Sequence, residues 1–148
     1  MIPPFTVSGG LPEGVHQAEM NEIEKRFSYN PRRLWLFGGL KRAMADLGTA
    51  GCQMLYLDGS FVTDKEFPGD FDACWDPKGV IIAKLDPVFL DFSNRRAAQK
   101  AKYFGEFFPA QATANATAPF YTFLKFFQMD TTTGIRKGII GIKITRIL

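Results

Sequence analysis

The pattern of apolar and polar positions predicts two helices in the first third of the chain, after an extended start. Residues 1–14 are rich in proline and glycine, which disfavours a helix or a central strand, so this segment is expected to lie extended over the surface. From Gln17 to Phe27 apolar residues recur at helical spacing, which predicts a short surface helix. Asparagine followed by proline predicts the start of a second helix over Asn30–Gly48.

The second helix is expected to have one buried face and one charged face. Apolar side chains recur along one stripe of it, which is typical of a helix packed on a core. These residues are Leu36, Leu40, Met44 and Leu47. Its basic residues are expected on the solvent-exposed face, and they are Arg32, Arg33, Lys41 and Arg42.

The rest of the chain alternates strand and helix patterns. Val80–Phe92 is an apolar run interrupted by Pro87, and it is interpreted as a strand or turn followed by a packed loop. Residues 110–118 are small and polar, which indicates a loop. The predicted strands are Met54–Leu57, Phe71–Trp75, Gly105–Phe108 and Gly138–Ile144. The predicted helices are Ser93–Lys102 and Pro119–Gln128, the second with Phe120, Phe123, Leu124 and Phe127 on its buried face.

This order of elements predicts one α/β (α+β) domain over residues 1–148, with a small mixed sheet and helices packed against it. The hydrophobic fraction of 46% supports a globular core, and the net charge of +3 is too mild for a dedicated nucleic-acid binder. Cys52 and Cys74 are expected to be buried free thiols. Neither a signal peptide nor a membrane-length apolar run is seen, so a cytoplasmic protein without membrane contact is expected.

Two aspartates supply the first candidate site. Asp70 and Asp72 are two residues apart, so on a strand both side chains point to the same face. Neighbouring carboxylates repel each other unless a cation lies between them. Magnesium is the natural occupant, because it prefers carboxylate and phosphate oxygens together.

The sequence before this pair carries a resemblance to a known superfamily. A strand ends in Gly59-Ser60, and Asp70-Phe71-Asp72 follows after nine intervening residues counted from Ser60. This arrangement resembles the nucleotidyltransferase superfamily that includes DNA polymerase beta. The wider chain, from the Ile-Pro-Pro-Phe start to the Lys-Gly-Ile-Ile segment near the end, looks like a bacterial family of short nucleotidyltransferase-like proteins known only as a domain of unknown function.

The resemblance implies a minimal nucleotidyltransferase fold and Mg²⁺-dependent transfer of a nucleoside monophosphate from a nucleoside triphosphate, with ATP as the default, to a hydroxyl on RNA or protein. Asp70 and Asp72 would bind two Mg²⁺ ions, which clamp the attacking and leaving oxygens. Gly59 and Ser60 would hold the triphosphate. Thr63 and Lys65 are further nucleotide-binding candidates, although Lys65 fits the role of an ordinary surface lysine equally well.

The superfamily usually supplies a third carboxylate from a neighbouring strand. Glu106 is favoured, because aromatic residues flank it in a predicted strand that follows a helix. Asp86 and Asp91 are the alternatives, because the run from Ala83 to Phe92 could itself form that strand. Small members of the superfamily often belong to bacterial toxin–antitoxin or phage-defence pairs, which implies a cognate protein partner.

Other interpretations stay open beside this one. The chain could be a catalytically inactive nucleotidyltransferase-like protein that acts as a binding partner, as an antitoxin or scaffold, because Phe61 and Val62 replace the small or basic residues common there. Asp58 is interpreted as a residue that closes its own turn. The predicted helix over Ser93–Lys102 has four basic residues, which are interpreted as a solvated face or as guides for a nucleotide or RNA. They are Arg95, Arg96, Lys100 and Lys102. Lys137 and Lys143 have the same two interpretations, and His16 is expected in a turn, as a cap or surface residue.

Overall fold

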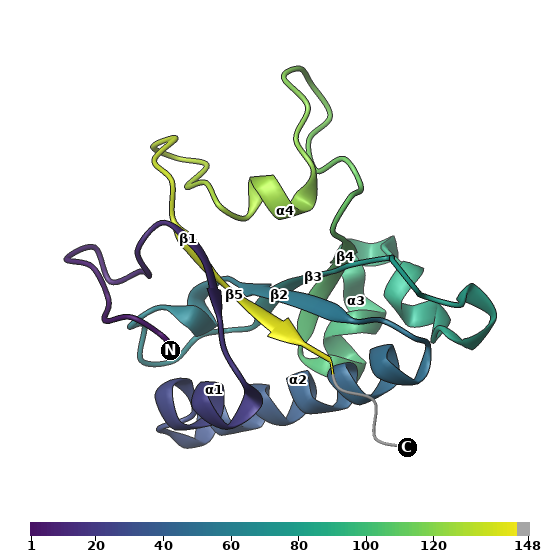
Figure 1. Cartoon of the computed structure of the whole chain (residues 1–148), viewed down its shortest axis with the longest axis horizontal. Helices are drawn as coiled ribbons and strands as arrows, with labels where there is room; N and C mark the ends of the chain where they lie inside the picture. The colour runs from purple at the N-terminus through teal and green to yellow at the C-terminus, as the bar shows by residue number, and fades with distance from the viewer. Residues whose placement is uncertain (145–148) are drawn as a thin grey trace.

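The computed structural model describes residues 1–144 and contains one five-stranded mixed sheet (Figure 1). The strand order is β1-β5-β2-β3-β4, in which β1 with β5 and β3 with β4 are parallel, while β2 is antiparallel to both of its neighbours. The predicted α/β class is therefore confirmed. The strands are β1 (Gly14–Gln17), β2 (Met54–Asp58), β3 (Phe71–Trp75), β4 (Gly105–Pro109) and β5 (Gly138–Lys143).

Helices cover the two faces of the sheet unequally. The longer helices lie on one face and the short α4 lies on the other (Figure 1). Asn30 caps the longest helix as expected, because its side chain accepts a hydrogen bond from the Arg33 amide. The helices are α1 (Met20–Phe27), α2 (Pro31–Thr49), α3 (Ser93–Tyr103) and α4 (Phe123–Phe126). Three short 3₁₀ segments join them: η1 (Ser60–Val62), η2 (Ile82–Lys84) and η3 (Pro87–Leu90).

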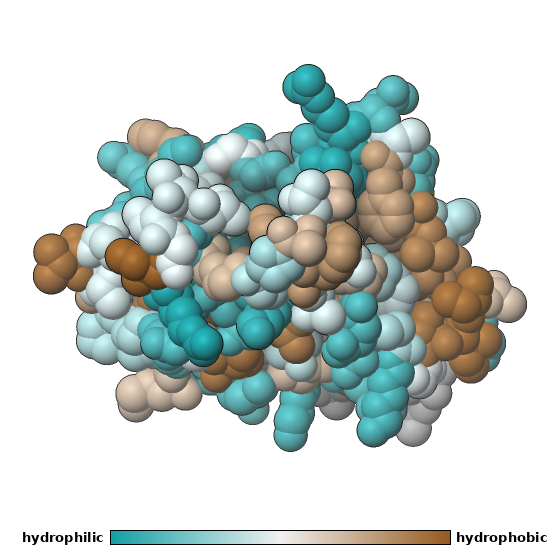
Figure 2. Space-filling model, turned by 90° about the horizontal axis from the view of Figure 1, so that it is seen from above, coloured by the Kyte–Doolittle hydropathy of each residue, from teal (hydrophilic) through white to brown (hydrophobic). Residues whose placement is uncertain are grey.

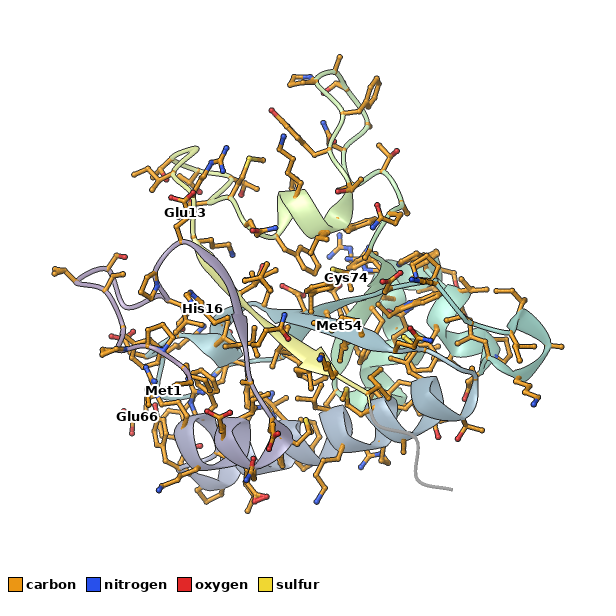
Figure 3. All side chains as sticks on the ribbon, in the orientation of Figure 1. Met1, Glu13, His16, Met54, Glu66 and Cys74 are labelled. Carbon is orange, nitrogen blue, oxygen red and sulfur yellow. The ribbon has the colours of Figure 1, made fainter. Side chains whose placement is uncertain are left out.

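Side chains of the central strands alternate between two apolar cores. Phe71, Ala73 and Trp75 of β3 belong to the larger core, which the sheet shares with α1, α2 and α3. Cys74 belongs to the smaller core on the α4 side, and it lies above the strands in Figure 3. Both cysteines are buried and free, as predicted. Alternation along β3 places Asp72 on the same side as Cys74, which is the side that faces α4.

Three predictions about elements need correction. Gly14–Gln17 forms a strand beside β5, so His16 lies in a strand and its Nε2 contacts the Pro12 carbonyl at 2.6 Å. The last helix covers only Phe123–Phe126, and Phe120 is 65% exposed. Val80–Phe92 contains two 3₁₀ segments, which confirms the turn and not the strand.

The last helix starts late because side-chain bonds hold the preceding segment outside a helix. Asn115 accepts a hydrogen bond from the Tyr121 amide at 2.8 Å, which closes a loop over residues 115–121. Thr122 then caps the helix by accepting from the Lys125 amide at 3.2 Å. A threonine cap therefore takes the role that the sequence analysis gave to Pro119.

Candidate metal centre

Three carboxylates converge at the end of the sheet where β2 finishes and β3 begins. Asp70, Asp72 and Glu106 each offer an oxygen, and these oxygens lie within 4.8 Å of one another. Strand register explains the meeting, because Asp72 pairs with Glu106 across the parallel strands β3 and β4. Asp70 lies just before β3, two residues from Asp72. The structure thus brings Glu106, rather than Asp86 or Asp91, to the aspartate pair.

The two alternative acids are engaged elsewhere. Asp86 caps η3 and forms an ion pair with Lys102. Asp91 accepts hydrogen bonds from the amide and the hydroxyl of Ser93. Both bonding patterns stabilise local turns, so neither carboxylate faces the cluster.

A fourth carboxylate lies on β2, across Asp72 from Glu106, so that the acids of β2, β3 and β4 form a row. Asp58 pairs with Asp72 in the register between β2 and β3, and it is only 5% exposed. Its two oxygens contact Lys137 Nζ at 3.0 and 3.1 Å. Burial raises the pKa of Asp58, although Lys137 and the Gly59 amide oppose the rise. This ion pair is not apparent from the sequence, in which Asp58 fits a residue that closes its own turn.

The pKa shifts of the clustered acids favour a state in which one proton is bound among them. Burial, together with a hydrogen bond and the charge from Glu106, raises the pKa of Asp72 to about 8. Burial also raises the pKa of Asp70, and the charge of Glu106 adds to this rise. Burial would raise the pKa of Glu106 as well, but its hydrogen bonds to Asp72 and Arg96 lower it overall. These shifts favour a protonated Asp72 beside an ionised Glu106 near neutral pH.

Basic side chains reach the cluster from α3. Arg96 places Nε at 2.8 Å and Nη2 at 2.6 Å from Glu106 Oε1, and Lys100 Nζ lies 3.4 Å from the same oxygen. Asn94, Arg95 and Arg96 all have positive φ, so this turn bends left-handed before α3 continues. The expectation of a wholly solvated basic face is therefore wrong for Arg96, which is bound to the site.

The Gly59-Ser60 turn lies directly against the aspartates. Gly59 has φ +90° and ψ −174°, a conformation that only glycine adopts readily. A Cβ on Gly59 would come within 3.1 Å of the Asp72 amide and of Asp72 Oδ2. The residue is thus required both for its backbone conformation and for close approach to the carboxylate.

The connection after Ser60 is organised by its own side chains. The hydroxyl of Thr63 donates to the Ser60 carbonyl at 2.7 Å, so it closes η1. Lys65 is exposed, and its positive charge opposes the rise in the pKa of Asp70. The structure therefore leaves Lys65 near the cluster, whereas the Thr63 hydroxyl is bound within the turn.

Arg33 of α2 anchors the connection that follows Ser60, contrary to the prediction that this arginine is solvated. It is fully buried, and it donates to the carbonyls of Phe27, Phe61 and Thr63 at 3.1, 2.6 and 2.7 Å. It also donates to the Lys65 carbonyl. No local pattern in the sequence signals this role, because a basic residue in an amphipathic helix normally faces solvent.

Comparison with known proteins identifies a family without an assigned activity. Residues 3–143 match the family described as a family of unknown function, DUF6932. The chain belongs to this family. No curated protein and no solved structure matches this DUF6932 chain. Within residues 1–144, none of its helices combines the length and apolar character required to cross a membrane.

The carboxylates of this DUF6932 chain form a suitable donor set for a hard divalent cation. Asp70, Asp72 and Glu106 offer only oxygen ligands, and all three are partly buried. Mg²⁺ prefers such oxygens and retains several waters or phosphate oxygens beside them. A bound cation would replace the proton of Asp72 in neutralising the cluster, and it would remove the repulsion between the carboxylates.

Proposed function

We propose that this protein is a Mg²⁺-dependent nucleotidyltransferase that moves a nucleoside monophosphate from a nucleoside triphosphate to a hydroxyl on RNA or protein. The observation that carries this proposal is the convergence of Asp70, Asp72 and Glu106 within 4.8 Å. The Gly59 turn lies against the same carboxylates, so a phosphate at the turn would meet the cation site. Phosphoryl transfer depends mainly on such positioning and charge neutralisation.

Asp70 and Asp72 would hold Mg²⁺, which supplies charge stabilisation at the transferring phosphorus when bound. In the reaction, the acceptor oxygen forms a bond to the α-phosphorus and the bond from that phosphorus to pyrophosphate breaks. Glu106 is ionised and lies beside the aspartates, so it can accept the proton of the acceptor hydroxyl. The three carboxylates therefore divide two roles in the proposed reaction: Asp70 and Asp72 hold the cation, and Glu106 accepts the proton.

Positive charge near the cluster supports an anionic substrate. Arg32, Lys65 and Lys100 all lie close enough to oppose the rise in the pKa of Asp70. Arg32 is fixed in place because it donates to the carbonyls of Pro68 and Gly69. Clustered cations at a cleft raise the local concentration of an anionic substrate. We place the reaction in the cytoplasm, where the free thiols of Cys52 and Cys74 stay reduced.

A second candidate function is favoured by the bonds of Glu106. Arg96 and Lys100 already neutralise this carboxylate from within the chain. In a catalytically inactive relative, these cations would take the role of the metal, and the protein would act by binding a partner, such as a toxin in a toxin–antitoxin or phage-defence pair. The two functions differ in whether nucleotide transfer occurs.

The test is a transfer assay with Mg²⁺, each α-labelled nucleoside triphosphate in turn, and a bacterial cell extract as the source of acceptors. We expect label on RNA or protein with the wild-type chain. Asp70→Ala, Asp72→Ala and Glu106→Gln should each abolish it. The matched control is Asp91→Asn, which changes an acid outside the cluster and should keep full activity. Absence of transfer with every nucleotide, together with a stable complex recovered from the extract, would support the second candidate.

A further inference from the structure

A cavity of about 300 Å³ opens beside the carboxylates, on the side of the sheet that faces α4. One wall is apolar and consists of Phe126, Phe127 and Met129. Asp72 lines the same cavity and belongs to the carboxylate cluster, so an occupant would touch the proposed reaction centre. The volume is at the lower end of the range for small-molecule sites, about 300–1,000 Å³. Figure 2 looks down on this face, where apolar and polar side chains are mixed.

The polar wall of the cavity is unsuited to phosphate. Asp58, Asp72 and Asp130 all line it, and Lys137 is its one basic residue in the described part of the chain. Lys137 already binds both oxygens of Asp58. A triphosphate in the cavity would meet more negative than positive charge, whereas hydroxyl and amine donors would find carboxylate acceptors.

Further positive charge lies near Asp70, which does not line the cavity. Arg32, Lys65 and Lys100 are close enough to Asp70 to oppose the rise in its pKa, and Lys100 also contacts Glu106 at 3.4 Å. The phosphates of a nucleotide are therefore attracted toward the Asp70 side. The group attached to those phosphates would extend across the cation site toward Asp58 and the apolar wall.

We infer that the cavity binds the nucleoside moiety of the triphosphate donor, with its base against Phe126 and Met129 and its sugar beside Asp58 and Lys137. This assignment rests on the proposed function. It adds that the segment from α4 to β5, which the carboxylate motif does not include, forms the substrate pocket. An apolar wall with a few converging polar groups is the usual composition of such a site. Base contacts with an aromatic side chain supply affinity for every base, because each base has a π-face.

The test compares two probes by calorimetric titration of the whole chain in Mg²⁺. One probe is the α,β-methylene analogue of each nucleoside triphosphate, which cannot be cleaved between those phosphates, and the other is inorganic tripolyphosphate. We expect the analogues to bind more tightly than tripolyphosphate. Phe126→Ala should weaken analogue binding by roughly 5- to 150-fold, the range for loss of a base–aromatic stack. It should leave tripolyphosphate binding unchanged.

A second variant protects the test against misfolding of the first. Thr131 lines the cavity and is exposed, so Thr131→Trp would fill the space without removing a core side chain. It should weaken analogue binding in the same selective way. The matched control is Phe120→Ala, which removes a 65% exposed aromatic outside the cavity and should change neither affinity.

The possible outcomes distinguish a failure of the pocket assignment from a failure of the proposed function. Equal affinity for the analogues and tripolyphosphate, with the latter lost in Asp70→Ala, would overturn the pocket and leave the proposed function standing. Wild-type analogue affinity in both cavity variants would overturn the pocket in the same way. Failure of both probes to bind would overturn the pocket and the proposed function together.

Discussion

Asp72 and Glu106 occupy paired positions on the parallel strands β3 and β4, and each places a carboxyl oxygen within 4.8 Å of the other. Burial and the neighbouring Glu106 raise the pKa of Asp72 to about 8, so Asp72 keeps its proton near neutral pH. In the absence of a cation, the cluster is therefore held by that proton and by Arg96, which binds Glu106 Oε1. A divalent cation must displace the proton before it can use both oxygens.

The raised pKa of Asp72 predicts that metal-free protein loses stability as pH rises. The native state holds the Asp72 proton up to about pH 8, whereas the unfolded chain releases it near 3.8. The native state therefore binds more protons in this range, and the free energy of unfolding falls as pH rises through it. Because each pKa unit corresponds to about 1.4 kcal/mol, the fall should exceed about 1 kcal/mol. The lowered pKa of Glu106 acts below its ordinary value of 4.5 and does not mask this fall.

Denaturant unfolding in EDTA at pH 6 to 9 measures this dependence. Asp72→Asn keeps a donor toward Glu106 but cannot ionise, so its stability should change little over the same range. Asp91→Asn is the control, because the pKa of Asp91 is lowered from its ordinary value of 3.8 and this group therefore stays ionised over the whole range. An equal slope in wild type and Asp72→Asn would show that Asp72 is ionised throughout.

Gly59 is predicted to be irreplaceable, in contrast to a second glycine in the same connection. Gly59→Ala would place a Cβ within 3.1 Å of Asp72 on a backbone with φ +90°. Strain of this kind costs about 1–3 kcal/mol. We also expect loss of Mg²⁺ binding, because the Asp72 carboxylate must move. Gly69→Ala meets no atom within 4 Å and should be neutral in both thermal unfolding and metal titration.

The sequence predicted the parts of the site that depend on local spacing. Asp70 and Asp72 come together because they are two residues apart at the start of β3, a strand that the apolar pattern predicts. The pairing of Asp72 with Glu106 is a matter of register between strands, so Glu106 could only be favoured over Asp86 and Asp91. Short apolar segments that end at turn residues predicted β2, β3 and β4, and alternation of apolar residues predicted β5, for the same local reason.

Long-range contacts explain what the sequence did not reveal. Asp58 and Lys137 meet although 79 positions separate them, because β2 and β5 are neighbours in the sheet. The short β1 is a strand only because β5 offers it a partner edge. Its segment carries no alternation long enough to predict a strand.

Arg33 also makes long-range contacts that the sequence does not reveal, and these contacts yield a prediction. Its guanidinium holds the carbonyls of Phe61, Thr63 and Lys65, so Arg33→Met would leave several of them without a donor. We expect a loss of about 3–5 kcal/mol in unfolding free energy. Arg33→Lys should recover little of it, because an ammonium cannot match the planar fork. Lys41→Met, on an exposed position of the same helix, is the control and should lie within about 0.5 kcal/mol of wild type.

Arg96 is predicted to compete with the metal. Its guanidinium binds Oε1 of Glu106, a member of the cluster, and its positive charge would repel an incoming cation. Arg96→Gln should therefore tighten Mg²⁺ binding by roughly tenfold, which corresponds to about 1.4 kcal/mol. Calorimetric titration measures the dissociation constant, and the exposed neighbour Arg95→Gln serves as the control. Weaker binding in Arg96→Gln would instead mean that Arg96 positions Glu106 for the metal. In that case the ion pair with Glu106 would support catalysis and would no longer favour the inactive binding protein.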